Sequence, residues 1–219
     1  MIRVLIADDQ SLVRTGFHLI LDLEPDMEVV GEAADGEECV RCVDRFDPDI
    51  VLMDVRMPVL DGIGAIRRLT EAGSRARILV LTTFDLDEYV FDTIRAGAAG
   101  FLLKDAPREQ LLSAIRQAVD GDAILAPSVT RRLIERFARS GLRGPFAGRF
   151  DSLSTREREV LALVARGLSN AEIAQQLFLG ESTVKTYIAR MLTKLEARDR
   201  IQAIVMAYEC GFMPFESDR

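Results

Sequence analysis

The sequence predicts an α/β domain, built as a doubly wound five-stranded parallel sheet, over residues 1–120 and an all-α domain of four helices over residues 151–219. Five short apolar runs that alternate with segments of helical periodicity indicate the sheet, because strands covered on both faces read as nearly continuous apolar stretches. Three helix-capping patterns indicate the helical domain. Residues 121–150 are expected to form a linker with a basic helix.

The apolar runs give the expected strands. They occupy residues 2–7, 28–34, 49–53, 77–82 and 99–103. In a parallel sheet with right-handed crossovers, the C-terminal ends of all strands lie at one edge. Ligands of open α/β sheets bind outside that edge, so the residues that follow the strands are the candidate site.

Those strand ends carry carboxylates, a hydroxyl and an ammonium group. They are Asp8, Asp9, Asp54, Thr82 and Lys104. Three ionised carboxylates cannot gather without a cation, and oxygen ligands with few protein donors suit Mg²⁺. The lysine and the threonine hydroxyl fit a phosphoryl group carried by one carboxylate, because phosphoryl transfer depends on positioning and charge neutralisation. A single aspartate at a strand end is more often a helix cap, so the prediction depends on all five residues together.

Charge is distributed unevenly along the chain, whose net charge is −7. Residues 1–122 carry 13 basic and 24 acidic side chains, residues 123–150 six and one, and residues 151–219 nine and ten. This asymmetry is more informative than the total, so a nucleic-acid partner is not excluded. The arginines of the linker, several of them in the helix expected at 129–138, could meet DNA or the acidic domain. We expect them to be solvated.

The composition also bears on location and redox chemistry. No apolar run reaches the roughly 18 residues of a membrane span, and the N-terminus meets two carboxylates at once, unlike a secretory signal. We therefore expect a cytoplasmic protein with no membrane partner. Its three cysteines are too few for a disulfide framework. Cys39 and Cys42 lie in a helical pattern, which favours packing over redox or metal chemistry.

Helix boundaries are legible in residues 151–219. Ser154-x-x-Glu157, Ser169-x-x-Glu172 and Asp199-x-x-Gln202 are capping-box patterns that open apolar-periodic runs. The expected helices are 155–166, 170–177, 181–195 and about 199–210. The second and third are joined by a short turn that contains glycine, which is the pattern of a helix-turn-helix.

The third of these helices is the expected DNA-reading element, because the second helix of a helix-turn-helix normally enters the major groove. Its apolar residues form one stripe and leave polar and basic side chains for the outer faces. Those outer residues are Thr183, Lys185, Thr186, Tyr187, Arg190 and Lys194. Such side chains can contact phosphates and base edges. A solvated helix face would explain Lys185 alone equally well.

Residues 1–120 resemble the receiver domain of two-component response regulators. The matching motifs are Asp8-Asp9, Asp54 followed by Met57-Pro58 and Asp61-Gly62, Thr82, and Lys104. The resemblance implies a flavodoxin-like fold and phosphorylation of Asp54 by a sensor histidine kinase. It further implies that Mg²⁺ is held by Asp9, Asp54, the Arg56 carbonyl and, through water, Asp8. Thr82 and Lys104 would bind phosphoryl oxygens, and Phe101 would stand at the aromatic switch position.

The segments Leu153–Leu161, Gly167–Ala174 and Thr183-Val184-Lys185 match the pattern of the LuxR-type helix-turn-helix, which residues 152–212 resemble. Joined to the receiver-like domain, they make the whole chain resemble a NarL/FixJ-type response regulator. The resemblance implies binding to double-stranded DNA and formation of a homodimer on phosphorylation. It makes the last helix a candidate dimerisation element, through Ile201, Ile204, Val205 and Tyr208. In two departures from the family pattern, Tyr187 replaces a histidine and Gly180 replaces a serine N-cap.

The sequence predicts a non-enzymatic regulator, and four other functions fit it less well. A phosphorylation-independent DNA-binding regulator with a degenerate receiver, or a pure interaction module, would not need the intact acidic set. A haloacid-dehalogenase-type phosphatase would need Asp-x-Asp, whereas Asp8 and Asp9 are adjacent. A ligand-sensing quorum regulator shares the C-terminal domain but would need a sensing pocket.

Overall fold

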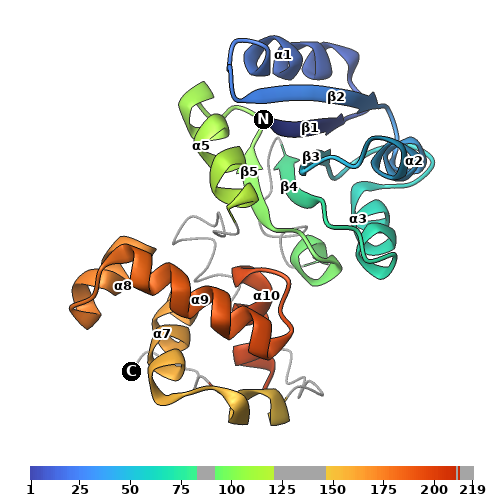
Figure 1. Ribbon diagram of the computed structural model, residues 1–219. Helices are drawn as coiled ribbons and strands as arrows, with labels where there is room; N and C mark the ends of the chain where they lie inside the picture. The colour runs from blue at the N-terminus through green and yellow to red at the C-terminus, as the bar shows by residue number, and fades with distance from the viewer. Residues whose placement is uncertain (83–91, 121–146, 211, 213–219) are drawn as a thin grey trace, which may run out of the picture. The chain divides into compact units, whose positions relative to one another are not determined.

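The computed structural model describes residues 1–82, 92–120, 147–210 and 212 (Figure 1). Its chain divides into two compact units, Met1–Ile124 and Leu125–Arg219, and each is described by itself. The basic helix expected at 129–138 lies outside the described residues. Within the described residues, no helix is long and apolar enough to cross a membrane.

The first unit contains a five-stranded, all-parallel sheet, as predicted. Its strands are β1 (Ile2–Ala7), β2 (Met27–Ala33), β3 (Ile50–Asp54), β4 (Arg77–Thr82) and β5 (Gly100–Leu103). The strand order is β2-β1-β3-β4-β5, and all neighbouring strands are parallel. The order reverses between β1 and β3, so the adjacent ends of these strands form the switch point at which open sheets bind ligands.

Helices cover both faces of this sheet (Figure 1). They are α1 (Ser11–Leu21), α2 (Gly36–Phe46), α3 (Gly62–Glu71) and α5 (Arg108–Val119). Apolar side chains of α1 and α5 share one core with alternate residues of the strands, because successive strand residues point to opposite faces. Helices α2 and α3 pack together over the other face.

Local side-chain caps start two of these helices. The Asp35 carboxylate accepts the Glu38 N–H at 2.8 Å and begins α2, and the Asp61 carboxylate accepts the Gly64 N–H at 2.7 Å and begins α3. Each bond satisfies one backbone donor that the first turn of a helix leaves unpaired. Cys39 is buried in α2, and burial raises the pKa of its thiol to about 12. A packing residue fits this environment, as predicted.

Among the residues described in the second unit, the structure has a 3-10 turn, η1 (Ala147–Ser152), and four helices. They are α7 (Thr155–Ala165), α8 (Asn170–Leu177), α9 (Glu181–Leu195) and α10 (Arg200–Glu209). Complete capping boxes open α7 and α8 at Ser154 and Ser169. Asp199 caps α10, but the Gln202 side chain accepts the Arg198 N–H instead of completing the box. The four helices begin and end within one residue of the predicted bounds.

Candidate functional site

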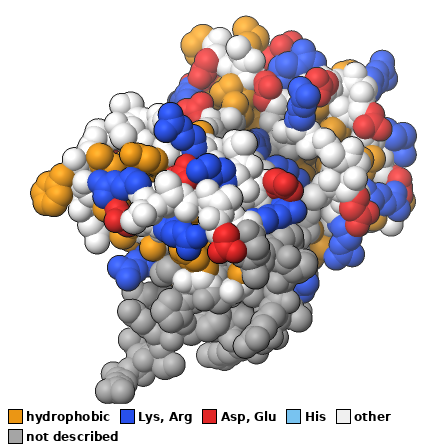
Figure 2. Space-filling model, turned by 60° about the horizontal axis from the view of Figure 1, so that its bottom comes forward, with side chains coloured by type: hydrophobic (Ala, Val, Ile, Leu, Met, Phe, Trp, Pro, Cys, Tyr) orange, Lys and Arg blue, Asp and Glu red, His pale blue; other side chains and the backbone are white. Residues whose placement is uncertain are grey.

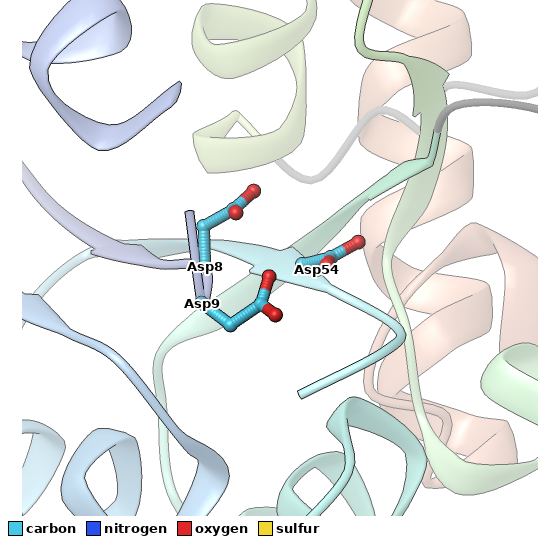
Figure 3. A group of neighbouring side chains, drawn as sticks. All are labelled: Asp8, Asp9 and Asp54. Carbon is cyan, nitrogen blue, oxygen red and sulfur yellow. The ribbon is translucent and has the colours of Figure 1, made fainter. Parts of the chain in front are cut away.

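Three aspartates meet at the switch point of the sheet (Figure 3). Asp8 and Asp9 directly follow β1 and Asp54 ends β3, and each offers a carboxylate oxygen within 4.8 Å of the others. Asp8 is 2% exposed and Asp54 7%, whereas Asp9 is exposed. The cluster is therefore buried at its base and open to solvent at Asp9.

Lys104 joins two of the three carboxylates. Its Nζ lies 2.6 Å from Asp8 Oδ2 and 3.1 Å from Asp54 Oδ1, and its side chain is only 7% exposed. The Lys104 N–H donates to the Thr82 carbonyl at 2.7 Å, which fixes the lysine just beyond β5. One ammonium among three carboxylates leaves two negative charges uncompensated when all are ionised. An oxygen donor set with this deficit fits a hard divalent cation such as Mg²⁺.

Asp54 lies in an environment that disfavours its ionised form. Burial raises its pKa above the ordinary range, because desolvation disfavours the carboxylate, while the charge of Lys104 opposes this and that of Asp8 adds to it. Asp54 Oδ1 also accepts the Val55 N–H at 2.9 Å. Burial thus disfavours the ionised form that a nucleophilic carboxylate requires, and the positive charge of Lys104 favours it.

The loop after Asp54 explains part of the Asp61-Gly62 motif. The Gly62 N–H donates to the Val55 carbonyl at 2.9 Å. A Cβ on Gly62 would lie 2.1 Å from the Asp54 carbonyl oxygen, so no larger residue fits without moving β3 or α3. Asp61 caps the helix and Gly62 lets the helix start directly against the strand end that carries Asp54.

The remaining residues predicted for this site lie at different depths. Thr82 ends β4 and is 6% exposed, and Phe101 lies in β5 beside Val80 and is 5% exposed, so its ring packs inside the unit. The Arg56 side chain is exposed in the loop after β3. Their roles in phosphoryl and metal binding stay predictions.

Sequence reasoning missed a contact to the cluster and a backbone feature of the loop after β3. Arg14 in α1 donates from Nη1 to the Asp8 carbonyl at 2.7 Å. No short-range pattern signals this contact, because a helix residue reaches back to a strand end. Val59 has a φ of 64° and is 84% exposed, an uncommon backbone conformation for a β-branched residue.

The second unit presents helix α9 as a candidate nucleic-acid interface. Val184, Ile188, Met191 and Leu195 form its buried stripe. Of the residues predicted to contact DNA, Tyr187 is partly exposed and the others are exposed. Among the described side chains visible in Figure 2, basic and acidic groups are interspersed.

Lys194 differs from the other residues predicted to contact DNA. Its Nζ lies 2.7 Å from Glu157 Oε2, and the Glu157 side chain is only 4% exposed in α7. The hydrogen bond from Lys194 lowers the pKa of Glu157. The ion pair ties the C-terminal part of α9 to α7, so Lys194 has a structural role in addition to any contact with DNA.

The residues predicted for dimerisation are mostly internal. Ile201, Ile204 and Tyr208 are buried in α10, and the Tyr208 hydroxyl donates to the Ala165 carbonyl at 3.1 Å. Val205 is the one of the four that is partly exposed. Their role in dimerisation stays a prediction, and within the monomer most of them serve the core.

Comparisons with known proteins match both units. Residues 4–116 match the response regulator receiver domain, and residues 151–207 match the bacterial regulatory proteins of the luxR family. An uncharacterized transcriptional regulatory protein of Bacillus subtilis (strain 168), YxjL, is 44% identical over 212 residues, which cover 97% of each chain.

Solved structures match along the same length. The response regulator ChrA of a heme-sensing two-component system is 37% identical, with a TM-score of 0.53, and the match covers 97% of this chain and 98% of that one. A structure of two RcsB dimers bound to two parallel DNAs is 25% identical, with a TM-score of 0.55, and the match covers 94% of this chain and 96% of that one.

Proposed function

The chain belongs to the two-component response regulators that join a receiver domain to a luxR-family DNA-binding domain, and we propose that phosphorylation of Asp54 controls its binding to DNA. The observation that carries the proposal is the cluster of Asp8, Asp9 and Asp54 with Lys104 between two of its carboxylates. The proposed receiver covers residues 1–120, the linker 121–150 and the DNA-binding domain 151–219. The family consists of transcriptional regulators, so we propose no catalytic turnover.

The phosphodonor would be the phosphohistidine of a sensor histidine kinase. An ionised oxygen of Asp54 attacks the phosphorus, the new P–O bond forms as the P–N bond breaks, and the released imidazole takes up a proton. Mg²⁺, held by Asp9, Asp54, the Arg56 carbonyl and, through water, Asp8, would supply charge neutralisation for the phosphoryl oxygens. Lys104 Nζ already lies 3.1 Å from Asp54 Oδ1, so it can form an ion pair with an oxygen of the phosphoryl group on Asp54.

The phosphoryl group would change the surface of the receiver through Thr82 and Phe101. The Thr82 hydroxyl binds a phosphoryl oxygen, and the buried Phe101 face repacks around the displaced threonine. Phe101 has no hydroxyl, so this switch depends on packing without a hydrogen bond from the ring. The repacked surface favours a homodimer.

Dimerisation would strengthen DNA binding without new base contacts. Two linked helix-turn-helix domains bind a pair of half-sites more tightly than one domain binds a single half-site, because the second binding event is intramolecular. The residues that would face the DNA are Thr183, Lys185, Thr186, Tyr187, Arg190 and, at the end of the helix, Lys194. Val205, the partly exposed residue of α10, is the best placed of the proposed dimer residues. DNA as the partner makes the cytoplasm the proposed location.

Asp54→Asn tests this function. We expect acetyl phosphate with Mg²⁺ to increase the DNA affinity of the wild type and to leave that of Asp54→Asn unchanged, measured by gel shift on DNA selected from a random pool. Asp44→Asn, the same substitution at an exposed position of α2, serves as the matched control and should respond like the wild type. A full response of Asp54→Asn to acetyl phosphate would show that Asp54 is not the phosphoacceptor that controls DNA binding. A wild type that does not respond would leave only a phosphorylation-independent DNA-binding protein.

A further inference from the structure

Every polar group of Asp8 has a partner. Its N–H donates to the Ala33 carbonyl at 3.0 Å, its Oδ1 accepts the Gln10 N–H at 2.9 Å, and its Oδ2 lies 2.6 Å from Lys104 Nζ. Its carbonyl, the remaining group, accepts from Arg14 Nη1 at 2.7 Å. Asp8 is therefore held on all sides. The carbonyl that Arg14 contacts belongs to the peptide group between Asp8 and Asp9.

Asp9 is held in a different way. Its side chain is exposed, and within the described part of the chain no hydrogen bond or ion pair fixes its carboxylate. The backbone sets the direction of the Asp9 Cα–Cβ bond, through the peptide between Asp8 and Asp9, and so the region that its carboxylate can reach. Rotation of this peptide would turn Asp9 away from Asp8 and Asp54, and the bond from Arg14 to the peptide oxygen opposes such a rotation.

Arg14 is itself held in place. Its guanidinium also donates from Nε to Glu32 Oε2 at 3.1 Å, and its side chain is only 17% exposed. The other oxygen of Glu32 lies 2.8 Å from His18 Nδ1. A guanidinium held by two acceptors in a fixed geometry orients its target more strictly than a single ammonium would.

From this geometry we propose that Arg14 is a positioning residue for the metal site: by fixing the Asp8–Asp9 peptide, it aims the Asp9 carboxylate at Mg²⁺. The inference rests on the metal site of the proposed function. The positioning role and electrostatics alone predict changes of opposite sign in Mg²⁺ affinity when Arg14 is removed. Removing a cation next to three carboxylates should tighten Mg²⁺ binding if charge alone matters, whereas loss of positioning should weaken it.

Titration of the full chain with MgCl2 alone, followed by amide NMR signals of the receiver without any phosphodonor, measures the effect. For Arg14→Met we expect Mg²⁺ affinity to fall about tenfold, the lower end of the loss seen when residues that orient metal ligands are removed. Arg14→Lys keeps one donor for the Asp8 carbonyl but loses the planar fork of the guanidinium, so it should recover part of this loss while remaining weaker than the wild type. Arg68→Met removes an arginine that pairs with Glu37 on the exposed surface and should bind Mg²⁺ like the wild type.

The outcomes separate the two proposals. Unchanged or tighter Mg²⁺ binding by Arg14→Met overturns the positioning role and leaves the metal site of the proposed function intact. If Arg14→Met does not fold, Arg14→Lys provides the test. An Mg²⁺ affinity of Arg14→Lys equal to that of the wild type then overturns the positioning role of Arg14. A wild type that binds no Mg²⁺, or an Asp9→Asn variant that binds as tightly as the wild type, overturns both proposals.

Discussion

Replacing Gly62 by alanine should destabilise the receiver and disturb the site at the same time. The added Cβ would lie 2.1 Å from the Asp54 carbonyl oxygen and 3.0 Å from Val55 Cα, whereas carbon–oxygen contacts normally lie at about 3.3 Å or more. Both groups are backbone, so neither can rotate away. The overlap is relieved only if the start of α3 moves away from the end of β3.

The size of the effect follows from three contributions. Overpacking of this kind costs about 1–3 kcal/mol, and the upper end applies because backbone must shift. Weakening the bond from the Gly62 N–H to the Val55 carbonyl, 2.9 Å long, adds about 1 kcal/mol. The higher helix propensity of alanine offsets at most about 1 kcal/mol. We expect the free energy of unfolding of the receiver to fall by about 3 kcal/mol.

Urea unfolding of the full chain, followed by far-ultraviolet circular dichroism and fitted with one transition per unit, measures this change. Gly16→Ala is the matched control. Gly16 lies within α1, and a Cβ there meets no atom within 4 Å, so alanine should stabilise the receiver by about 0.5–1 kcal/mol. A loss below about 1 kcal/mol for Gly62→Ala would show that the strand end and the helix start are not held as rigidly as the distances imply.

Three further predictions concern other parts of the molecule. Asp54→Asn should stabilise the receiver at neutral pH in EDTA, because a raised folded-state pKa means that ionised Asp54 destabilises the fold. This gain in the free energy of unfolding should vanish in acid, below the unfolded-state pKa of the carboxyl. A gain that persists in acid would contradict the raised pKa of Asp54. Phe178 is 95% exposed with a φ of 55°, so Phe178→Asn should raise the stability of the second unit by about 1 kcal/mol, since asparagine tolerates the left-handed region; a lower thermal midpoint would count against this. Lys185→Ala should reduce the slope of log affinity for DNA against log salt concentration by about one unit. Lys194→Met should instead lower the free energy of unfolding of the second unit by about 1–2 kcal/mol, because it leaves buried Glu157 without its cation. Equal effects of the two variants on both measurements would refute this division of roles.

The accuracy of the predictions depended on the range of the interactions involved. The starts of α7 and α8 were predictable because Ser154 and Ser169 contact groups three residues away. The strands were predictable because burial on both faces requires continuous apolar runs, and the parallel order then brought Asp8, Asp9 and Asp54 to one edge. The third capping pattern was only half right: Asp199 caps the helix, but the Gln202 side chain accepts from the Arg198 N–H.

The sequence by itself determined the fold class, the bounds of the strands and of helices α7, α8, α9 and α10 to within one residue, and the residues of the acidic cluster. Each depends on periodicity, on local caps or on the rule that parallel strands end at one edge. Only the tertiary structure decided which side chains hold that cluster and which helix residues are occupied elsewhere. Arg14 reaches the Asp8 carbonyl from a helix, and Lys194 pairs with Glu157 in another helix. Such contacts form between elements whose mutual placement is set by packing of the whole core, and no local pattern encodes them.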